Sequence, residues 1–371
     1  KKTIFSLYYD WWKNIDKFIF SLIILLFITG LFFSLVSTSL LVSDKLETNE
    51  YEFFFKHLSF VFLGLFTIFV LSSINEEKLF KISPFIFLLS LISLFLVPII
   101  GVEVNSAQRW IDLYFLPRFQ PIELVKPYLI ILISLILSNE KYNNIYFKYF
   151  FSFLITLIVA LLLAAQPDIG QTLLVFFSWS VLIFISGINI IFLITSCLIL
   201  FIILYFSITY VPKFQYIKNR ILSFFNTETG THNAQSEKAI DSITSGGYFG
   251  KGIGEGTLKN RVPEAHTDYI ISVISEEFGV IAIILILLLF LIFIYSVFKK
   301  VYLENDERTK LILVGCTSLI LVQAMIHIGV NIRLFPTTGM TLPFISYGGS
   351  SIISISILSG VILNLTKRKI N

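Results

Sequence analysis

Long runs of predominantly apolar residues limit the fold of this chain more than any other feature. Several runs reach eighteen residues or more, enough for a helix to cross the roughly 30 Å hydrocarbon core of a bilayer. The 371-residue chain is 56% hydrophobic and 14% charged, whereas soluble domains carry about 25% charged residues. The sequence therefore predicts an all-α polytopic membrane protein.

About ten transmembrane helices can be placed, and they form a single integral membrane domain over residues 1–371. A polar segment, 212–270, separates the seventh span from the eighth and is expected to be a large loop. The expected spans are 18–37, 57–74, 84–100, 121–138, 148–165, 172–187, 190–211, 271–298, 310–331 and 347–366.

Basic residues in short loops predict the orientation, because Lys and Arg are retained on the cytoplasmic side. The two tails and the 75–83, 139–148 and 299–310 loops carry fifteen, whereas the short loops on the other side carry five. Both termini are therefore expected on the cytoplasmic side of the membrane, with the 212–270 loop outside. The net charge of +4 follows from this pattern and requires no nucleic-acid partner. Cys197 and Cys316 lie inside expected spans, which excludes a disulfide framework or a zinc spacing.

The segment 101–127 combines an outer loop with the polar start of a span. Glu123 and Lys126 share one helix face, and ionisable groups inside a span usually face a cavity or a partner. The pair is either a structural ion pair or part of a cavity lining. Arg109 and Trp110, just before it, are typical of an interfacial anchor. A second segment, 164–171, is an outer turn with three polar side chains, and its signal is weak.

The long loop contains the largest number of candidate functional residues. Its glycine run, 246–256, lacks the Walker A spacing and a βαβ context, so it indicates backbone that turns sharply or approaches a ligand closely. Asp268 lies at the outer membrane surface, with His266 two residues away, and could act on a lipid headgroup. Alternatively, Thr267 or Asp268 is a helix N-cap. Glu276 and Glu277 lie two turns into the next span and must face a polar cavity or pair with a cation.

The fourth polar segment, 331–351, contains two prolines, three glycines and several hydroxyls. Irregular backbone at membrane depth is tolerated only where it is buried in protein or lines a cavity. This segment is therefore expected to face the same side as the long loop.

Together the four segments resemble the SEDS family of bacterial cell-wall proteins (shape, elongation, division and sporulation), over nearly the whole chain. Within the family, the sequences of these motifs are more similar to the division branch than to the elongation branch. The residues that carry the resemblance are Arg109-Trp110-Ile111, Gln120-Pro121 with Glu123 and Lys126, Gln166-Pro167-Asp168, Gln235-Ser236, Ser245-Gly246-Gly247, Gly250, Gly252, PEAHTD at 263–268, Glu276-Glu277-Phe278-Gly279 and PFISYGGSS at 343–351.

The resemblance implies a peptidoglycan glycosyltransferase that polymerises lipid II into β1→4 glycan strands, with the essential acidic residue at Asp268. It also implies a class B penicillin-binding protein as partner, together with other divisome membrane proteins. No cofactor is firmly implied, although a divalent cation, Mg or Mn, is possible. The expected substrate-binding residues are Arg109, Glu123, Lys126, Gln235, Ser236, Lys259, His266 and Ser346.

The chemistry expected of these residues is a single inverting displacement. Asp268 would be the general base for a sugar hydroxyl, and Arg109 and Lys126 would stabilise the leaving diphosphate. Two alternatives remain at this point. One is a lipid II flippase or other transporter, which inverted repeats and helices broken near the midplane would favour. The other is a non-catalytic scaffold that recruits a transpeptidase.

Overall fold

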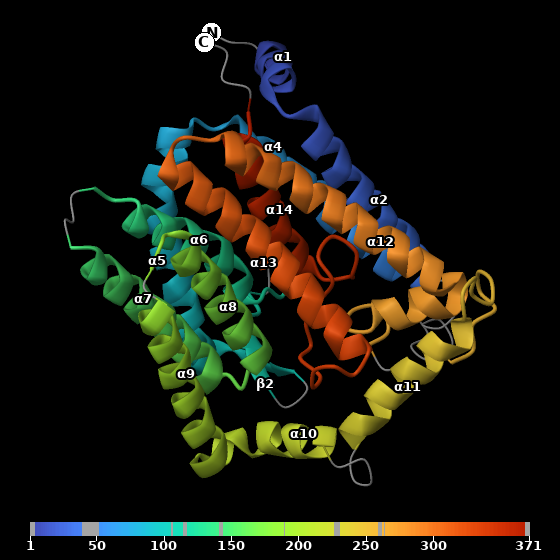
Figure 1. Ribbon diagram of the computed structural model, residues 1–371. Helices are drawn as coiled ribbons and strands as arrows, with labels where there is room; N and C mark the ends of the chain where they lie inside the picture. Colours follow the sequence, from blue (N-terminus) through green and yellow to red (C-terminus); the bar gives the residue numbers. More distant parts are fainter. Residues whose placement is uncertain are drawn as a thin grey trace.

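A computed structural model describes residues 4–38, 52–104, 107–113, 117–140, 144–188, 190–225, 231–258, 262 and 264–367. The described chain is almost entirely helical and has one small two-stranded sheet (Figure 1). Its elements are α1 (Ile4–Asn14), α2 (Lys17–Thr38), α4 (Glu52–Ser73), α5 (Glu76–Ile100), β1 (Val102–Val104), β2 (Ala107–Trp110), α6 (Pro121–Leu137), α7 (Ile145–Ala165), α8 (Ile169–Ile185), α9 (Ile190–Tyr210), the 3₁₀ turn η1 (Pro212–Phe214), α10 (Gln215–Phe225), α11 (Thr231–Gly246), α12 (Ile270–Leu303), α13 (Glu307–Asn331) and α14 (Gly349–Leu365).

Each of the ten expected spans corresponds to a helix, and the fold is that of an all-α polytopic membrane protein. Seven helices within the described ranges are long and apolar enough to cross a membrane, and α8 and α14 are shorter apolar helices. The largest boundary error concerns α5, which begins at Glu76 instead of residue 84. The Asn75 side chain accepts a hydrogen bond from the Glu77 amide, and this cap starts the helix before its apolar run.

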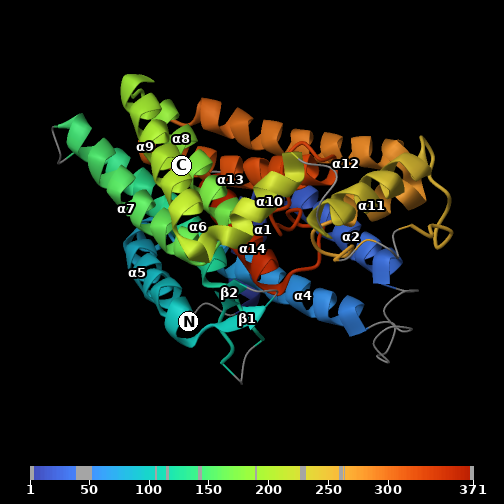
Figure 2. The same ribbon diagram turned by 90° about the horizontal axis from the view of Figure 1, so that it is seen from below.

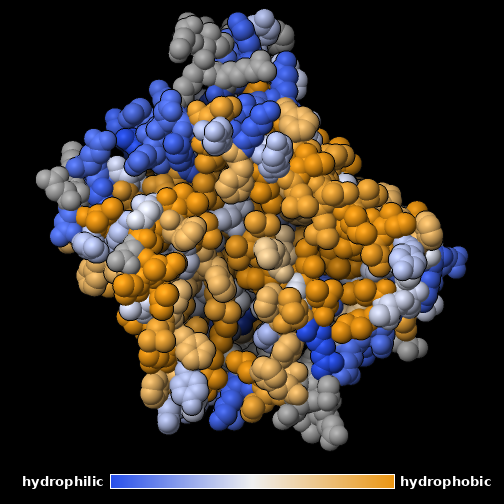
Figure 3. All heavy atoms as spheres, viewed as in Figure 1, coloured by the Kyte–Doolittle hydropathy of each residue, from blue (hydrophilic) through white to orange (hydrophobic). Residues whose placement is uncertain are grey.

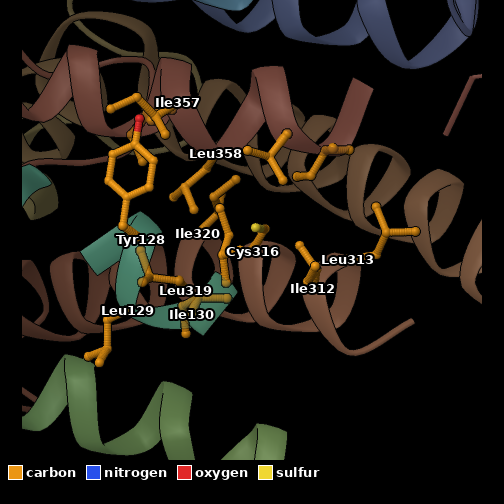
Figure 4. Close-up of a cluster of buried hydrophobic side chains, with 14 of the residues drawn as sticks. Tyr128, Leu129, Ile130, Ile312, Leu313, Cys316, Leu319, Ile320, Ile357 and Leu358 are labelled. Atoms are coloured by element: carbon orange, nitrogen blue, oxygen red, sulfur yellow. The ribbon is translucent and has the colours of Figure 1, made fainter. Parts of the chain in front are cut away.

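The core lies where α6, α13 and α14 meet. Tyr128, Cys316 and Leu358 belong to it, together with neighbouring Ile and Leu side chains (Figure 4). The helix α14 packs mainly on α4, and small residues allow a close approach there. A Cβ added at Gly360 would lie 2.9 Å from the Leu71 Cβ. Small residues at helix contacts are the usual solution inside membranes.

The ends of the bundle differ. The helix α1 lies at one end, and the β1–β2 hairpin and α10 lie at the other (Figure 1). Apolar side chains form a broad belt between a polar cap at the α1 end and polar patches at the lower edge of the view (Figure 3). Such a belt is the surface that a bilayer core requires.

The expected long loop is not simply a loop, because it contains the helices α10 and α11. Seen from below, α10 and α11 run across the molecule from α9 toward α12 (Figure 2). The sequence reading missed α11, since its polar composition hides a buried face. Ala239 and Ser242 are fully buried on that face.

Candidate active site

A cavity of about 810 Å³ opens at the hairpin end of the bundle. Segments far apart in the sequence build it: α4, the hairpin, the first turns of α6 and α8, the turn before α12 and the chain before α14. Its polar and aromatic lining includes Lys56, Arg109, Trp110, Arg118, Gln120, Glu123, Gln171, Glu264, His266, Asp268, Thr341 and Tyr347. The structure thus brings together four of the predicted site residues, namely Arg109, Glu123, His266 and Asp268.

The turn that carries Asp268 is fixed through its backbone. The Glu264 carbonyl accepts hydrogen bonds from the amides of Thr267 and Asp268, both at 3.1 Å. The carbonyls of the next residues accept hydrogen bonds from other segments of the chain. The amide of Tyr347 donates to His266 O at 3.1 Å, and the Ser346 hydroxyl donates to Thr267 O at 2.7 Å.

The third carbonyl of the turn, that of Asp268 itself, accepts a hydrogen bond from Asn331 Nδ2 at 3.0 Å. Three successive carbonyls are therefore tied to two other elements, which limits how far the Asp268 carboxylate can move. Such pre-organisation suits a catalytic group.

The helix-cap interpretation of this turn is wrong. The N-cap of α12 is Tyr269, whose side chain makes no cap hydrogen bond. The Thr267 hydroxyl instead donates back to the carbonyl of Glu264 at 3.2 Å, and Asp268 stands one position before the cap.

His266 lies beside aromatic rings at the edge of the cavity. Its ring centroid is 5.3 Å from that of Phe53 and 5.9 Å from that of Tyr347. Burial lowers the pKa of His266 below its ordinary value, and the nearby charge of Glu264 offsets part of that shift. The imidazole is therefore neutral near pH 7, with one ring nitrogen able to donate and one able to accept.

Glu123 and Lys126 form a buried ion pair at the inner wall of the cavity. Lys126 Nζ lies 2.8 Å from Glu123 Oε2, and Gln171 Nε2 donates to Glu123 Oε1 at 3.1 Å. Behind the pair, Gln323 accepts from Lys126 at 3.4 Å and donates to the Thr341 carbonyl at 3.0 Å. Both interpretations of the pair are therefore partly correct: Glu123 lines the cavity, and Lys126 is a fully buried structural partner.

Arg109 projects from β2 onto the 164–171 turn. Its guanidinium donates to the carbonyls of Gln166 and Pro167, and its Nε lies 3.6 Å from Asp168 Oδ2. Asp168 is also the N-cap of α8. The weak turn motif is thus the support that holds Arg109 at the cavity wall.

The remaining predicted residues lie elsewhere. Gln235 and Ser236 belong to α11, outside the cavity lining, and Lys259 lies outside the described residues. Ser346 is buried and is not among the lining residues. It holds the Asp268 turn through the Thr267 carbonyl, so its role is positional.

The glycine run folds against a break in α12, and we refer to residues 246–256 as the glycine loop. Gly279 has φ +77° and ψ 179°, which interrupts the helix. A side chain at Gly246, Gly250 or Gly279 would collide with the facing backbone. The sharp turns expected of the glycines are present, since several of them have positive φ. The close approach is made to α12 and not to the ligand that the sequence suggested.

Glu276 and Glu277 are both buried, and each carboxylate accepts hydrogen bonds from the glycine loop or the chain beside it. Glu276 accepts hydrogen bonds from the Ser242 hydroxyl and the Leu258 amide, both at 2.9 Å. Lys251 Nζ lies 3.4 Å from the same carboxylate, and the Gly254 amide donates to Glu277 at 3.2 Å. These carboxylates clamp the glycine loop to the helix.

Sequence reasoning missed several cavity residues, including Lys56 and Arg118. Both appear in the sequence as ordinary basic residues of outer loops, and no motif distinguishes them. Among the described residues, no group of three or more His, Cys, Asp and Glu side chains could hold a metal ion.

Comparison with known proteins finds similarity over nearly the whole chain. Residues 16–371 match the sequence family described as cell cycle protein, FTSW_RODA_SPOVE. A Haemophilus influenzae protein named "Probable peptidoglycan glycosyltransferase FtsW" is 32% identical over 96% of this chain and 93% of its own length. The Caulobacter vibrioides protein of the same name is 29% identical over 97% of this chain and 91% of its own.

Solved structures share the fold. A chain of a peptidoglycan synthase complex that coordinates polymerization and crosslinking superposes with a TM-score of 0.78, at 25% identity over 95% of this chain and 97% of that one. The rod shape determining protein RodA of Thermus thermophilus gives a TM-score of 0.69, at 25% identity over 95% of this chain and 96% of that one.

Proposed function

The chain belongs to the FtsW/RodA/SpoVE family and is a peptidoglycan glycosyltransferase, and from this premise we propose that it polymerises lipid II at the outer face of the cytoplasmic membrane. The observation that carries the proposal is the cavity at the hairpin end, where Asp268, His266, Glu123 and Arg109 converge. The basic-residue pattern supports placing that end outside, which is where a lipid-linked disaccharide would be presented.

In the proposed reaction, Asp268 is the general base. A sugar 4-hydroxyl is a weak nucleophile, and its proton passes to the Asp268 carboxylate as the oxygen attacks the anomeric carbon. The new C–O bond forms as the bond to the diphosphate breaks, so the α-linked donor gives a β1→4 product. One displacement needs no second carboxylate nucleophile.

The leaving diphosphate takes the electron pair and needs positive charge nearby. Arg109 lines the cavity and is held by the 164–171 turn, and Lys56 and Arg118 line the same space. Lys126 is fully buried behind Glu123, so we assign it a positioning role for Glu123.

We further propose septal cell-wall synthesis and a class B penicillin-binding protein as partner. The relatives named FtsW support the first assignment. The similarity to a chain of a synthase complex that combines polymerization with crosslinking supports the second.

The test is polymerisation of purified lipid II in liposomes, with and without the cognate transpeptidase. We expect Asp268→Asn to lower the rate by a factor on the order of 10²–10⁴, since that is the usual contribution of a general base. Glu255→Gln is the matched control, because Glu255 is an exposed carboxylate outside the cavity lining.

Three outcomes would change the assignment. Full activity of Asp268→Asn would move the base elsewhere. An equal loss in Glu255→Gln would mean that the substitutions act through the fold. Absence of polymer under every partner condition, together with movement of lipid II across the bilayer, would favour the flippase.

A further inference from the structure

The glycine loop presents apolar side chains outward, although most of its backbone packs against α12. The exposed fractions are 76% for Tyr248, 81% for Phe249 and 64% for Ile253. We propose that this loop is a membrane anchor whose aromatic side chains insert into the outer headgroup region of the lipid bilayer. The anchor is separate from the cavity, since none of the three side chains lines it.

The loop is attached to one level of α12. The amides of Val280 and Ile281 donate to the carbonyls of Gly247 and Tyr248, at 3.0 and 3.3 Å. In the other direction, the Lys251 amide donates to Glu276 O at 2.9 Å. These bonds fix the height of the loop to the break at Gly279.

That level coincides with the outer surface of a membrane crossed by the part of α12 that follows Gly279, and not with the expected start of the eighth span at residue 271. The apolar run 280–298 ends at Lys299 and Lys300, and as a helix it spans about 28 Å at roughly 1.5 Å per residue. This length matches the hydrocarbon core of roughly 30 Å. The break at Gly279 therefore lies at the outer interface, and the loop attached there lies at headgroup depth.

The surface next to the loop is also apolar. Val280, Ile281 and Ile284 are exposed on α12 just beyond the break, and the surface over α12 is largely apolar (Figure 3). Aromatic side chains are enriched at membrane–water interfaces. Of the two charged side chains of the loop, Lys251 turns back to Glu276, and Glu255 is exposed. This chemistry favours a lipid surface over a polar protein partner.

The anchor can be tested by spin labels in nanodiscs of anionic phospholipid. In a Cys197→Ser background, single labels are placed at Phe249→Cys, at Lys238→Cys on the exposed side of α11, and at Leu288→Cys on the lipid-facing side of α12. Cys316 is fully buried and does not react. Collision rates with oxygen and with a water-soluble nickel complex then report depth.

The ratio of oxygen to nickel collision rates is expected to be several-fold higher for the label at 249 than for the label at 238. It is expected to be lower for the label at 249 than for the label at 288. A label at Tyr248→Cys provides a second reading at a side chain that makes no core contact. Equal nickel access at 249 and 238 would overturn the anchor. Protection of 249 from both reagents only after addition of the transpeptidase would also overturn it, in favour of a protein-docking surface.

Discussion

At the scale of single residues, Lys126 and Glu123 place two full charges inside the helix bundle. Each depends on the other, because Lys126 is fully buried and Glu123 is nearly so. Removal of one partner leaves an uncompensated buried charge, which is more harmful than removal of both. The pair therefore predicts strong coupling between substitutions at the two positions.

Lys126→Met is expected to lower the free energy of unfolding by roughly 3–5 kcal/mol, because the Glu123 carboxylate loses its cation. The double variant Glu123→Gln/Lys126→Met should recover most of that loss. Unfolding in detergent, followed by circular dichroism, measures both. If the double variant is as unstable as Lys126→Met, the ion pair is not what stabilises this region.

His266 predicts a dependence of stability on pH. Burial lowers its pKa, while Glu264 counteracts part of that effect, and Lys56 and Tyr347 line the same cavity. The unfolded chain then binds the proton more tightly. The neutral ring therefore contributes to the stability of the folded protein above about pH 6.5, the ordinary pKa of histidine. This contribution is lost as the pH falls below that value.

The melting temperature of the native chain should therefore fall on acidification from about pH 6.5, and it should fall less in His266→Gln. Comparison of the two chains at each pH removes the contributions of the other histidines. Parallel curves for the two proteins would show that His266 does not contribute to this dependence.

At the scale of elements, the break in α12 joins the glycine loop to the helix that follows Asp268. The conformation of Gly279, with φ +77° and ψ 179°, is essentially restricted to glycine. A Cβ at this position would also meet the Tyr248 carbonyl. The site thus combines backbone strain with a steric conflict.

Gly279→Ala is expected to lower stability by more than the roughly 1–3 kcal/mol of backbone strain alone, and to lower polymerisation with it. Gly187→Ala is the matched control, because Gly187 has φ +82° and nothing within 4 Å of an added Cβ. Melting temperatures of the two variants separate strain from collision. Similar losses at both positions would mean that the packing of the loop on α12 adds nothing.

The sequence predicted the elements unequally well. Apolar runs located a helix at each of the ten expected spans, because burial in a bilayer requires a length and a composition that can be counted. The helix α11 escaped notice, since a polar helix with a narrow buried face has a weak periodic signal. The glycine run predicted sharp turns or a close approach to a ligand. The segment that the glycines contact, the broken helix α12, depends on tertiary structure and could not be predicted.

At the scale of the whole molecule, the orientation of the bundle is a separate prediction. In a Cys197→Ser background, a membrane-impermeant maleimide applied to spheroplasts should label Glu255→Cys and not Asn305→Cys. Asn305 lies in the exposed turn between α12 and α13, and it should react only after permeabilisation. Labelling of Asn305→Cys in sealed spheroplasts would reverse the assigned topology.

Some residues of the candidate site could be predicted from sequence motifs, and others could not. Asp268 and His266 stand in one short motif, and the structure places both at the cavity. Lys56 and Arg118 join them only through the packing of α4 and the segment after the hairpin. Conversely, Gln235 and Ser236 carry the resemblance but lie on α11, outside the cavity lining. Motifs identify residues, whereas the cavity depends on how distant segments meet.

The floor of the cavity has an electrical consequence. A polar hollow that enters a membrane under voltage shortens the insulating layer, and a proton leak through it would discharge the cell. Here Lys126 and Glu123 neutralise each other at the inner wall. One turn further along α6, Ile130 belongs to a buried apolar cluster that also includes Ile320 (Figure 4). A cavity that ends on a neutralised ion pair and a buried apolar cluster leaves the rest of the bundle as an insulating barrier.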